Sequence, residues 1–322
     1  MKNIFITGAS GTIGRGFIKK YYKDYKFYSY SRNEKAQVAL KREFPDIEIF
    51  LGSVEDKSNL ETCISNLSID IILHAAALKH VDTAEKQPSQ AFKANILGTM
   101  NILEIARKFE IPKVVGISTD KACSPDNVYG MSKFLMEKVM EEFNGTGLRT
   151  SCCRFGNVAW SNGSVLPFWL NLKESDKPLP LTHKEMTRLI FTSTEAAELI
   201  HRSIELIDDT NEFFILSKNM KSCKMIDLAQ LISSEIIDVG LRPGEVLYED
   251  LISKKEINNA FHLKNEKYII LSKEKKFTGN LVKLISPVNS ETAEKMSTEE
   301  MINILEDVKN HRESVNPIKF NY

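Results

Sequence analysis

Short apolar runs and longer amphipathic stretches alternate along the first half of the chain. Runs rich in β-branched and aromatic residues occur at 2–7, 26–31, 47–52, 69–76 and 113–119. Segments 14–25 and 95–109 instead repeat apolar residues at the spacing of an amphipathic helix. This repeated order of strand and helix predicts an α/β fold with a doubly wound, parallel Rossmann-type sheet.

The alternation fades after residue 157, where we expect a second, smaller lobe of mixed α/β structure. Loops are predicted at 161–169 and 173–188, a helix at 193–207, a strand at 212–217 and a helix that begins near the capping-like residues 297–300. We therefore predict a Rossmann domain over 1–160, with a segment near 186–217 returning to it, and a second lobe over 161–322.

Charge and hydropathy exclude several kinds of partner. The chain has 43 Lys and Arg residues and 43 Asp and Glu residues, so it has no general basic field for nucleic acid or an anionic membrane. No apolar stretch approaches the roughly 18 residues of a membrane span. Residues 1–6 run directly into a glycine-rich turn, without space for a signal peptide. We expect a cytoplasmic protein that binds neither nucleic acid nor membrane.

The cysteine and histidine residues predict neither a disulfide framework nor a metal site. The five cysteines are odd in number and contain no CxxC pair. His74 and His80 are six positions apart, which is not the i, i+4 spacing that places two ligands on one helix face.

The first candidate site is a glycine-rich turn between the first strand and the first helix. Gly8, Gly11 and Gly14 form GxxGxxG at this point. Glycines there let the backbone approach a pyrophosphate, while the helix N-terminus supplies N–H donors. The pattern indicates a dinucleotide site; the alternative is a tight structural turn.

The end of the second strand bears on which dinucleotide binds. NAD enzymes of this type place an acidic residue here for the ribose 2′-hydroxyl, but this chain has Ser31 and Arg32. Because a guanidinium pairs well with a 2′-phosphate, NADP is favoured over NAD. The alternative is a solvated arginine on a surface loop.

Tyr129 and Lys133 form a YxxxK motif on a predicted helix. Four residues apart, they share one helix face. We expect the lysine ammonium to lower the pKa of the phenol, so that the phenolate takes a proton from a substrate hydroxyl.

Taken together, these motifs resemble the extended short-chain dehydrogenase/reductase family. The resemblance rests on TGASGTIG at 7–14, HAAALKHVDTAE at 74–85, Asn95 and YGMSK at 129–133. Within that family, STDKACSPDNVYGMSK at 118–133 resembles the UDP-N-acetylglucosamine 4,6-dehydratases, notably the soluble C5-inverting type of nonulosonic acid biosynthesis. Further similar segments are 154–158, 186–199 and 241–253.

The resemblance implies a role for each matching position. The cofactor-binding residues would be Gly8, Ser10, Gly11, Thr12, Ile13, Gly14, Ser31, Arg32, Ala75, Ala76, Ala77, Lys79, Asn95, Tyr129 and Lys133. The catalytic residues would be Thr119, Asp120, Lys121, Tyr129 and Lys133. The nucleotide-sugar contacts, mainly from the second lobe, would be Lys79, Asn157, Arg188, Arg242 and Glu245.

The implied activity is a 4,6-dehydratase acting on a nucleotide sugar, and the implied assembly is a homo-oligomer, either a dimer or a hexamer. Lys121 would be the C5 base, its pKa lowered by partial burial and by Lys133, and Asp120 would protonate the leaving C6 hydroxyl. Ser53 and Asn162 stand where relatives commonly have Asp and Arg, so UDP and GDP sugars both stay open. A 4-epimerase or simple oxidoreductase of the same fold is the alternative, because it needs Tyr129 and Lys133 but no second acid/base pair.

Overall fold

The computed structural model describes residues 1–273, 277 and 281–307. The end of the predicted second lobe, 308–322, lies outside them. Within the described residues the main sheet has ten strands. They are β1 (Lys2–Thr7), β2 (Tyr25–Ser31), β3 (Glu48–Leu51), β4 (Ile71–His74), β5 (Lys113–Thr119), β6 (Arg149–Phe155), β10 (Phe214–Lys218), β14 (Ala260–Leu263), β15 (Tyr268–Leu271) and β16 (Leu281–Lys283).

The strand order of this sheet is β16-β14-β15-β10-β6-β5-β4-β1-β2-β3. Neighbouring strands from β10 to β3 are parallel, and β15, β14 and β16 add an antiparallel edge. The central strands are apolar and buried on both faces, which is what a parallel sheet covered by helices requires. The predicted doubly wound Rossmann sheet is confirmed.

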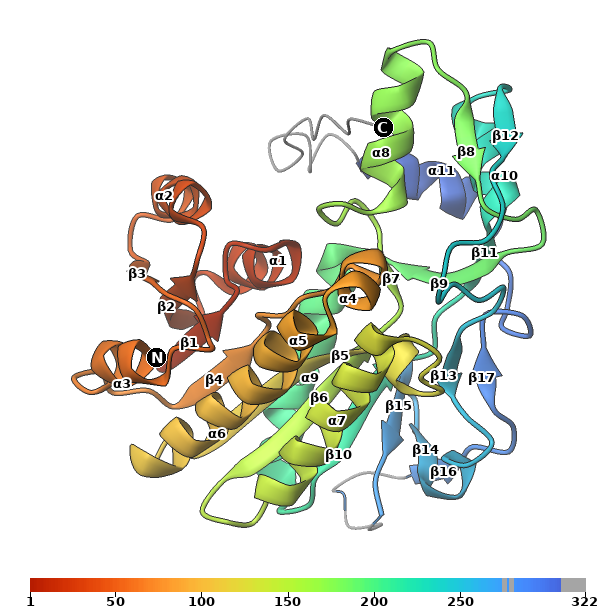
Figure 1. The fold of residues 1–322 in the computed structure, drawn as a ribbon. Helices are drawn as coiled ribbons and strands as arrows, with labels where there is room; N and C mark the ends of the chain where they lie inside the picture. The colour runs from red at the N-terminus through yellow and green to blue at the C-terminus, as the bar shows by residue number, and fades with distance from the viewer. Residues whose placement is uncertain (274–276, 278–280, 308–322) are drawn as a thin grey trace.

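Helices cover both faces of the sheet (Figure 1). In Figure 1, α6 and α7 lie in front of the strands, while α9 lies behind them and packs against α1. The helical segments of this part are α1 (Thr12–Tyr21), α2 (Glu34–Glu43), α3 (Lys57–Ile64), α4 (Val81–Lys86), α5 (Pro88–Ala91), the π-helix η1 (Phe92–Leu97), α6 (Gly98–Lys108), the 3-10 turn η2 (Asp120–Ala122), α7 (Val128–Phe143) and α9 (Ser193–Asp209).

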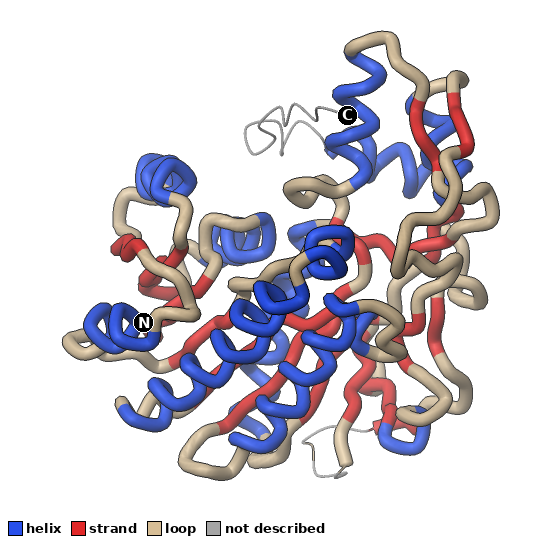
Figure 2. The backbone as a smooth tube through the Cα atoms, in the orientation of Figure 1, coloured by secondary structure: helices blue, strands red, loops and turns tan. Residues whose placement is uncertain are grey.

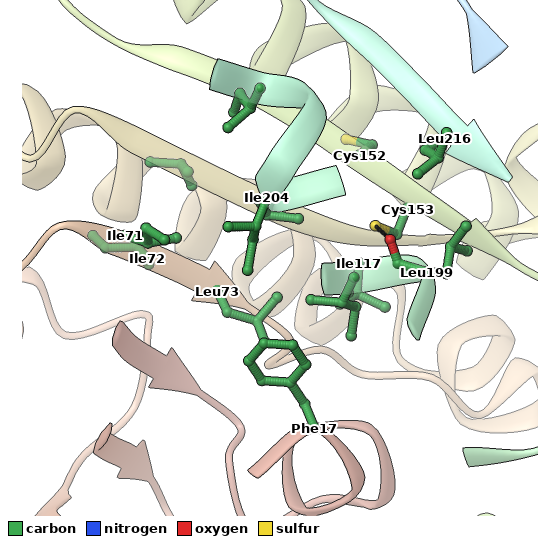
Figure 3. Close-up of a cluster of buried hydrophobic side chains, with 14 of the residues drawn as sticks. Phe17, Ile71, Ile72, Leu73, Ile117, Cys152, Cys153, Leu199, Ile204 and Leu216 are labelled. Carbon is green, nitrogen blue, oxygen red and sulfur yellow. Dashed lines mark hydrogen bonds between the residues drawn. The ribbon is translucent and has the colours of Figure 1, made fainter. Parts of the chain in front are cut away.

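The main core forms between the sheet and the α1–α9 pair. Figure 3 shows Phe17 of α1 beside Leu73 of β4, with Ile204 of α9 and Ile117 of β5 close by. The side chains of Phe17, Leu73 and Ile204 are buried almost completely. α9 belongs to the segment 186–217 that was predicted to return to the first domain, and here it completes one face of the sheet.

The register of the parallel strands brings the candidate site residues to one edge. Thr7 at the end of β1 pairs with Tyr30 of β2 and with His74 of β4. The glycine-rich turn, the Ser31–Arg32 pair and the segment 75–79 therefore emerge side by side, at the edge where ligands bind in such sheets.

A second group of elements lies beyond this edge, at the upper right of Figures 1 and 2, with its own core around Trp160, Trp169, Leu228 and Met301. Its short strands pair as β11-β9-β7 and β12-β8, whereas β13 and β17 pair with each other and pack against the main core. The elements outside the main sheet and its helices are β7 (Asn157–Val158), α8 (Val165–Glu174), β8 (Leu179–Leu181), β9 (Thr187–Phe191), β11 (Ser222–Lys224), α10 (Met225–Ile232), β12 (Ile236–Asp238), β13 (Asp250–Ile252), the 3-10 turn η3 (Ile257–Asn259), β17 (Val288–Asn289) and α11 (Thr298–Glu306).

The loops predicted at 161–169 and 173–188 are wrong in part. Residues from Val165 onward form helix α8, and residues 179–181 form a strand. Pro167 does not prevent the helix because it lies in the first turn, where a backbone N–H has no intrahelical acceptor. The helix predicted near 297–300 is confirmed, since Ser297 and Glu300 form a capping box at the start of α11.

Two further properties concern membranes and metals. Across the described ranges, no helix combines the length and apolar character needed to cross a lipid bilayer. In the same part of the chain, no three His, Cys, Asp or Glu side chains are grouped so that they could hold a metal ion.

Candidate active site

A cavity of about 690 Å³ lies at the carboxyl ends of the parallel strands. Its walls come from the glycine-rich turn, the ends of β2, β4 and β5, the start of α7, and residues 155–166. The predicted site residues that line it are Gly8, Ser10, Gly11, Thr12, Ile13, Gly14, Ser31, Arg32, Ala75, Ala76, Ala77, Lys79, Thr119, Lys121, Tyr129, Lys133 and Asn157.

The glycine-rich turn has the geometry of a pyrophosphate site. Gly8 has a φ of 70°, and a Cβ atom there would lie 2.8 Å from the Ala76 nitrogen. A Cβ atom at Gly14 would lie 2.6 Å from the Cα of Ala9, so helix α1 can approach the turn after β1 this closely only with glycine at position 14. Gly11 is the N-cap residue of α1 and has no side chain that could accept a hydrogen bond from the first N–H groups of the helix. The first N–H groups of this helix can therefore donate to an anion, which fits a dinucleotide.

The end of β2 carries a hydroxyl and a guanidinium. Ser31 Oγ is 2.9 Å from Ser10 Oγ of the glycine-rich turn, which links the two loops that would hold the ribose. Arg32 is exposed and lines the cavity. Neither Ser31 nor Arg32 is acidic, so neither can supply a carboxylate to a ribose hydroxyl.

Asn95 is not among the residues that line the cavity, but its side chain is hydrogen-bonded to a segment that does. Its Oδ1 accepts a hydrogen bond from the Leu78 nitrogen at 2.8 Å, and its Nδ2 donates to the Leu78 oxygen at 2.9 Å. The same amide donates to Ser132 Oγ on α7 at 2.9 Å. Asn95 therefore positions the 75–79 segment relative to the helix that carries Tyr129.

Tyr129 and Lys133 lie on the same helix, but they interact differently from the expectation. Lys133 Nζ donates to the Ile117 oxygen at 2.7 Å, and burial lowers its pKa to about 8. Burial raises the pKa of Tyr129 to about 12, while the charge of Lys121 and a hydrogen bond from Thr119 oppose the rise. The expectation that Lys133 lowers the phenol pKa is wrong for this state of the site, because Lys121 provides the nearby positive charge.

Asp120 and Lys121 form a buried cluster with a residue that sequence analysis missed, Glu249. Asp120 Oδ1 accepts from Thr119 Oγ1 at 2.9 Å and from Lys121 Nζ at 3.1 Å. Lys121 Nζ also lies 3.0 Å from Glu249 Oε1. Burial would lower the pKa of Lys121, but the two carboxylates outweigh it and raise this pKa. The predicted lowering of the Lys121 pKa is therefore wrong for this state.

Glu249 belongs to the segment 241–253, whose sequence resembles that of the dehydratases. This resemblance does not indicate which residue of the segment contacts Lys121. Burial raises the pKa of Glu249, and the charge of Lys121 opposes this rise. The side chain is 8% exposed. The site thus holds two carboxyl groups around one lysine.

The structure does not place the predicted residues Arg188, Arg242 and Glu245 in the cavity wall. The buried guanidinium of Arg188 donates to the backbone oxygens of residues 187, 246 and 247, so it holds the segment that leads to Glu249. Arg242 is exposed, with Nη1 4.0 Å from Asp82 Oδ2, and its backbone nitrogen donates to Glu245 Oε2 at 3.2 Å.

The loop around Asn162 joins the two halves of the site. Lys79 Nζ donates to the Asn162 oxygen at 2.6 Å, and the Asn162 nitrogen donates to Thr12 Oγ1 at 3.1 Å. Both contacts use backbone atoms of Asn162, so they do not depend on the Arg that relatives commonly have here. The loop is thereby hydrogen-bonded both to the segment 75–79 and to the start of α1.

Comparison with known proteins shows the family of the chain. The family model described as polysaccharide biosynthesis protein matches residues 4–273, and the chain belongs to this family. An inverting UDP-N-acetylglucosamine 4,6-dehydratase of Campylobacter jejuni is 34% identical over 288 residues, covering 86% of this chain and 84% of that protein. The predicted resemblance to these dehydratases is confirmed.

Other relatives carry different descriptions. An uncharacterized membrane protein of Methanocaldococcus jannaschii is 36% identical, covering 86% of this chain and 92% of that protein. A UDP-glucose 4-epimerase of Rickettsia rickettsii is 32% identical, covering 82% and 81%. Among solved structures, Pen from Bacillus thuringiensis has a TM-score of 0.86 and 27% identity, covering 97% of this chain and 98% of that one.

Proposed function

We propose that this protein is a nucleotide-sugar 4,6-dehydratase, a lyase that converts a UDP- or GDP-N-acetylhexosamine to its 4-keto-6-deoxy derivative. One observation carries the proposal: Asp120 and Lys121 lie together at the end of β5, and Lys121 shares the cavity with Tyr129 and Lys133. A second acid/base pair beside YxxxK is needed for removing water across C5 and C6, whereas oxidation at C4 needs only the first pair.

A bound nicotinamide would accept the hydride from C4 and return it to C6. The remaining steps belong to side chains of this chain. As a phenolate stabilised by the Lys121 charge, Tyr129 takes the O4 proton. Lys121 then removes the C5 proton, which the new ketone has made acidic, and Asp120 protonates the departing C6 hydroxyl. Asp120 Oδ2 is buried without a partner among the described residues, so it is the oxygen left for contact with the leaving hydroxyl.

A 4-epimerase is the second candidate, and the similarity to the Rickettsia UDP-glucose 4-epimerase favours it. Such an enzyme would use Tyr129 and Lys133 in the same way and would leave C5 and C6 unchanged. The two functions therefore differ in the product rather than in the cofactor site.

The test is a reaction of the purified protein with a panel of UDP and GDP sugars in D₂O, analysed by mass spectrometry and NMR. A dehydratase gives a product that has lost water and carries one solvent deuterium at C5. Absorbance at 340 nm shows no net change, because the hydride is recycled. A product with its C6 oxygen intact and only C4 inverted would reject the dehydratase and leave the epimerase.

We propose NADP as the cofactor, supported by Ser31 and Arg32 at the end of β2. The dinucleotide would be held mainly by residues 1–160 with the returning segment near 186–217, and the nucleotide sugar mainly by residues 161–322. A cytoplasmic location in nonulosonic acid biosynthesis is proposed as well. The five cysteines, all free thiols here, support a reducing compartment.

A homo-oligomer, dimer or hexamer, is also proposed. Its support is an exposed apolar face on η1 and α7, formed by Phe92, Met131, Phe134 and Leu135. These two helices pack against each other, so their apolar side chains form one surface that a second copy of the chain would cover.

A further inference from the structure

Glu249 reaches the catalytic cluster from a different part of the chain and is held rigidly there. Its backbone nitrogen donates to Ser290 Oγ at 3.0 Å, and its backbone oxygen accepts from the Ser290 nitrogen at 2.9 Å. Arg188 holds the carbonyls of residues 246 and 247 just before it. The carboxylate of Glu249 is therefore placed against Lys121 by the elements of the second half, not by β5.

The proposed reaction requires Lys121 in two different protonation states. During oxidation at C4, its positive charge stabilises the phenolate of Tyr129. During removal of the C5 proton, the same nitrogen must be a neutral amine with a free lone pair. Because Asp120 and Glu249 favour the ammonium form, Lys121 has to lose a proton between these two steps.

Two carboxylates lie within reach of that proton, and they are not equivalent. Asp120 Oδ1 already accepts from Thr119 Oγ1, from the Lys121 nitrogen and from Lys121 Nζ, so the oxygen that faces Lys121 is shared among three donors. Burial raises the pKa of Glu249. Among the described residues, two other titratable groups face the cluster. The guanidinium of Arg188 acts to lower the pKa of Lys121, and the phenol of Tyr129 lies close to Lys121 and Asp120.

We propose that Glu249 is the internal proton acceptor that converts Lys121 from an ammonium to the C5 base. An N–H bond of Lys121 breaks and an O–H bond forms on Glu249 Oε1 across the 3.0 Å contact, leaving an amine and a carboxylic acid with no net change of charge. Lys121 then takes the C5 proton, and the electrons of the C–H bond remain on the sugar as an enolate. When Lys121 returns a proton to C5, the proton on Glu249 moves back to the lysine.

This inference rests on the proposed dehydratase function and predicts a particular pH dependence. With Glu249 present, the transfer is internal, so the rate of C5 exchange does not depend on pH near neutrality. In Glu249→Gln the proton must leave for solvent instead. The rate of exchange should then fall by roughly tenfold or more at about pH 7 and rise by about tenfold per pH unit, as for a base whose neutral form is a small fraction.

The experiment measures incorporation of solvent deuterium at C5 of UDP-N-acetylglucosamine in single turnovers of the holoenzyme, between about pH 6 and pH 8. Asp250→Asn is the matched control, because Asp250 is the next residue and bonds Ser124 at 2.9 Å, away from Lys121. The control should keep the pH-independent rate. Oxidation at C4, followed as transient absorbance at 340 nm, should persist in Glu249→Gln.

Exchange in Glu249→Gln at the wild-type rate and without pH dependence would overturn the proposal. If that variant does not fold, Glu249→Asp decides, because it keeps a carboxylate: a slower but pH-independent exchange supports the proposal, and a tenfold change per pH unit rejects it. Failure of the proposed function looks different, since the wild type would then form no 6-deoxy sugar.

Discussion

Arg32 follows β2 and lines the cavity, and under the proposed choice of NADP its guanidinium would bind the phosphate on the adenosine ribose. A charge-assisted contact of this kind contributes about 1.5–3 kcal/mol. We therefore expect Arg32→Asp to weaken NADP binding by roughly 10- to 100-fold and to leave NAD affinity within a few-fold. Isothermal titration of both cofactors measures this ratio. Lys35→Asp on α2, which changes the charge equally at an exposed position, is the control. Unchanged NADP affinity in Arg32→Asp would mean that Arg32 points into solvent.

Some site residues were predictable from the sequence and others were not. The glycine-rich turn was predictable because Gly8 and Gly14 meet a local requirement of backbone geometry. The partner of Lys121 was not, because Glu249 comes from a distant segment and its contact exists only after both halves have folded. For the same reason, neighbours along the chain could not reveal that Lys133 bonds a carbonyl of β5.

At the scale of elements, β6, α7 and the segment after β13 are joined by one buried arginine. Arg154 makes paired hydrogen bonds to both oxygens of Glu137 on α7, at 3.1 and 2.8 Å. It also bonds Glu256 and the Leu251 oxygen. Arg154 and Glu137 are almost fully buried, so removal of one partner leaves a charge poorly compensated in the interior.

We expect Glu137→Gln to destabilise the protein by about 3 kcal/mol, since breaking a buried ion pair leaves a charge without compensation. In a chain of this size that corresponds to a fall in Tm of roughly 4–5 °C. Differential scanning calorimetry measures the change. Glu141→Gln, on the same helix but in a partly exposed pair with Lys138, should change stability by less than about 1 kcal/mol. Equal Tm values for the two variants would contradict the assigned importance of the Arg154 network.

The elements of the first half were predictable because their apolar spacing and their tertiary role agree. Strand β1 lies where the pattern of residues 2–7 placed it, and helix α1 overlaps the predicted segment 14–25 but begins two residues and ends four residues earlier. Helix α8 was missed because Gly163 and Pro167 suggested a loop, while the burial of Trp169 in the second core stabilises a helix. Antiparallel strands β14 and β16, added to an otherwise parallel sheet, likewise depend on contacts that no local pattern describes.

At the scale of the whole molecule, acid stability should depend on a histidine beneath the site. His74 ends β4 and is fully buried, with its ring nitrogens 2.8 Å from Thr7 Oγ1 and 3.1 Å from Thr99 Oγ1. Burial, aided by the charge of Lys133, lowers its pKa from 6.5 to about 3. The unfolded chain therefore binds one more proton than the folded chain between these two pH values. The stability from the neutral His74 is fully present above pH 6.5 and is lost as the pH falls toward 3.

The slope of this loss approaches about 1.4 kcal/mol per pH unit, or roughly 2 °C in Tm per unit. We expect the Tm of the wild type to fall more steeply between about pH 6 and pH 4.5 than that of His74→Gln, which has no group titrating at this position. Calorimetric scans across this range compare the slopes, so a lower absolute stability of the variant does not affect the result. His262→Gln, which changes a partly exposed histidine on β14, should keep the wild-type slope. Parallel slopes for the wild type and His74→Gln would show that His74 is protonated in the folded protein and that the Thr7–His74–Thr99 hydrogen bonds adapt to the charged ring.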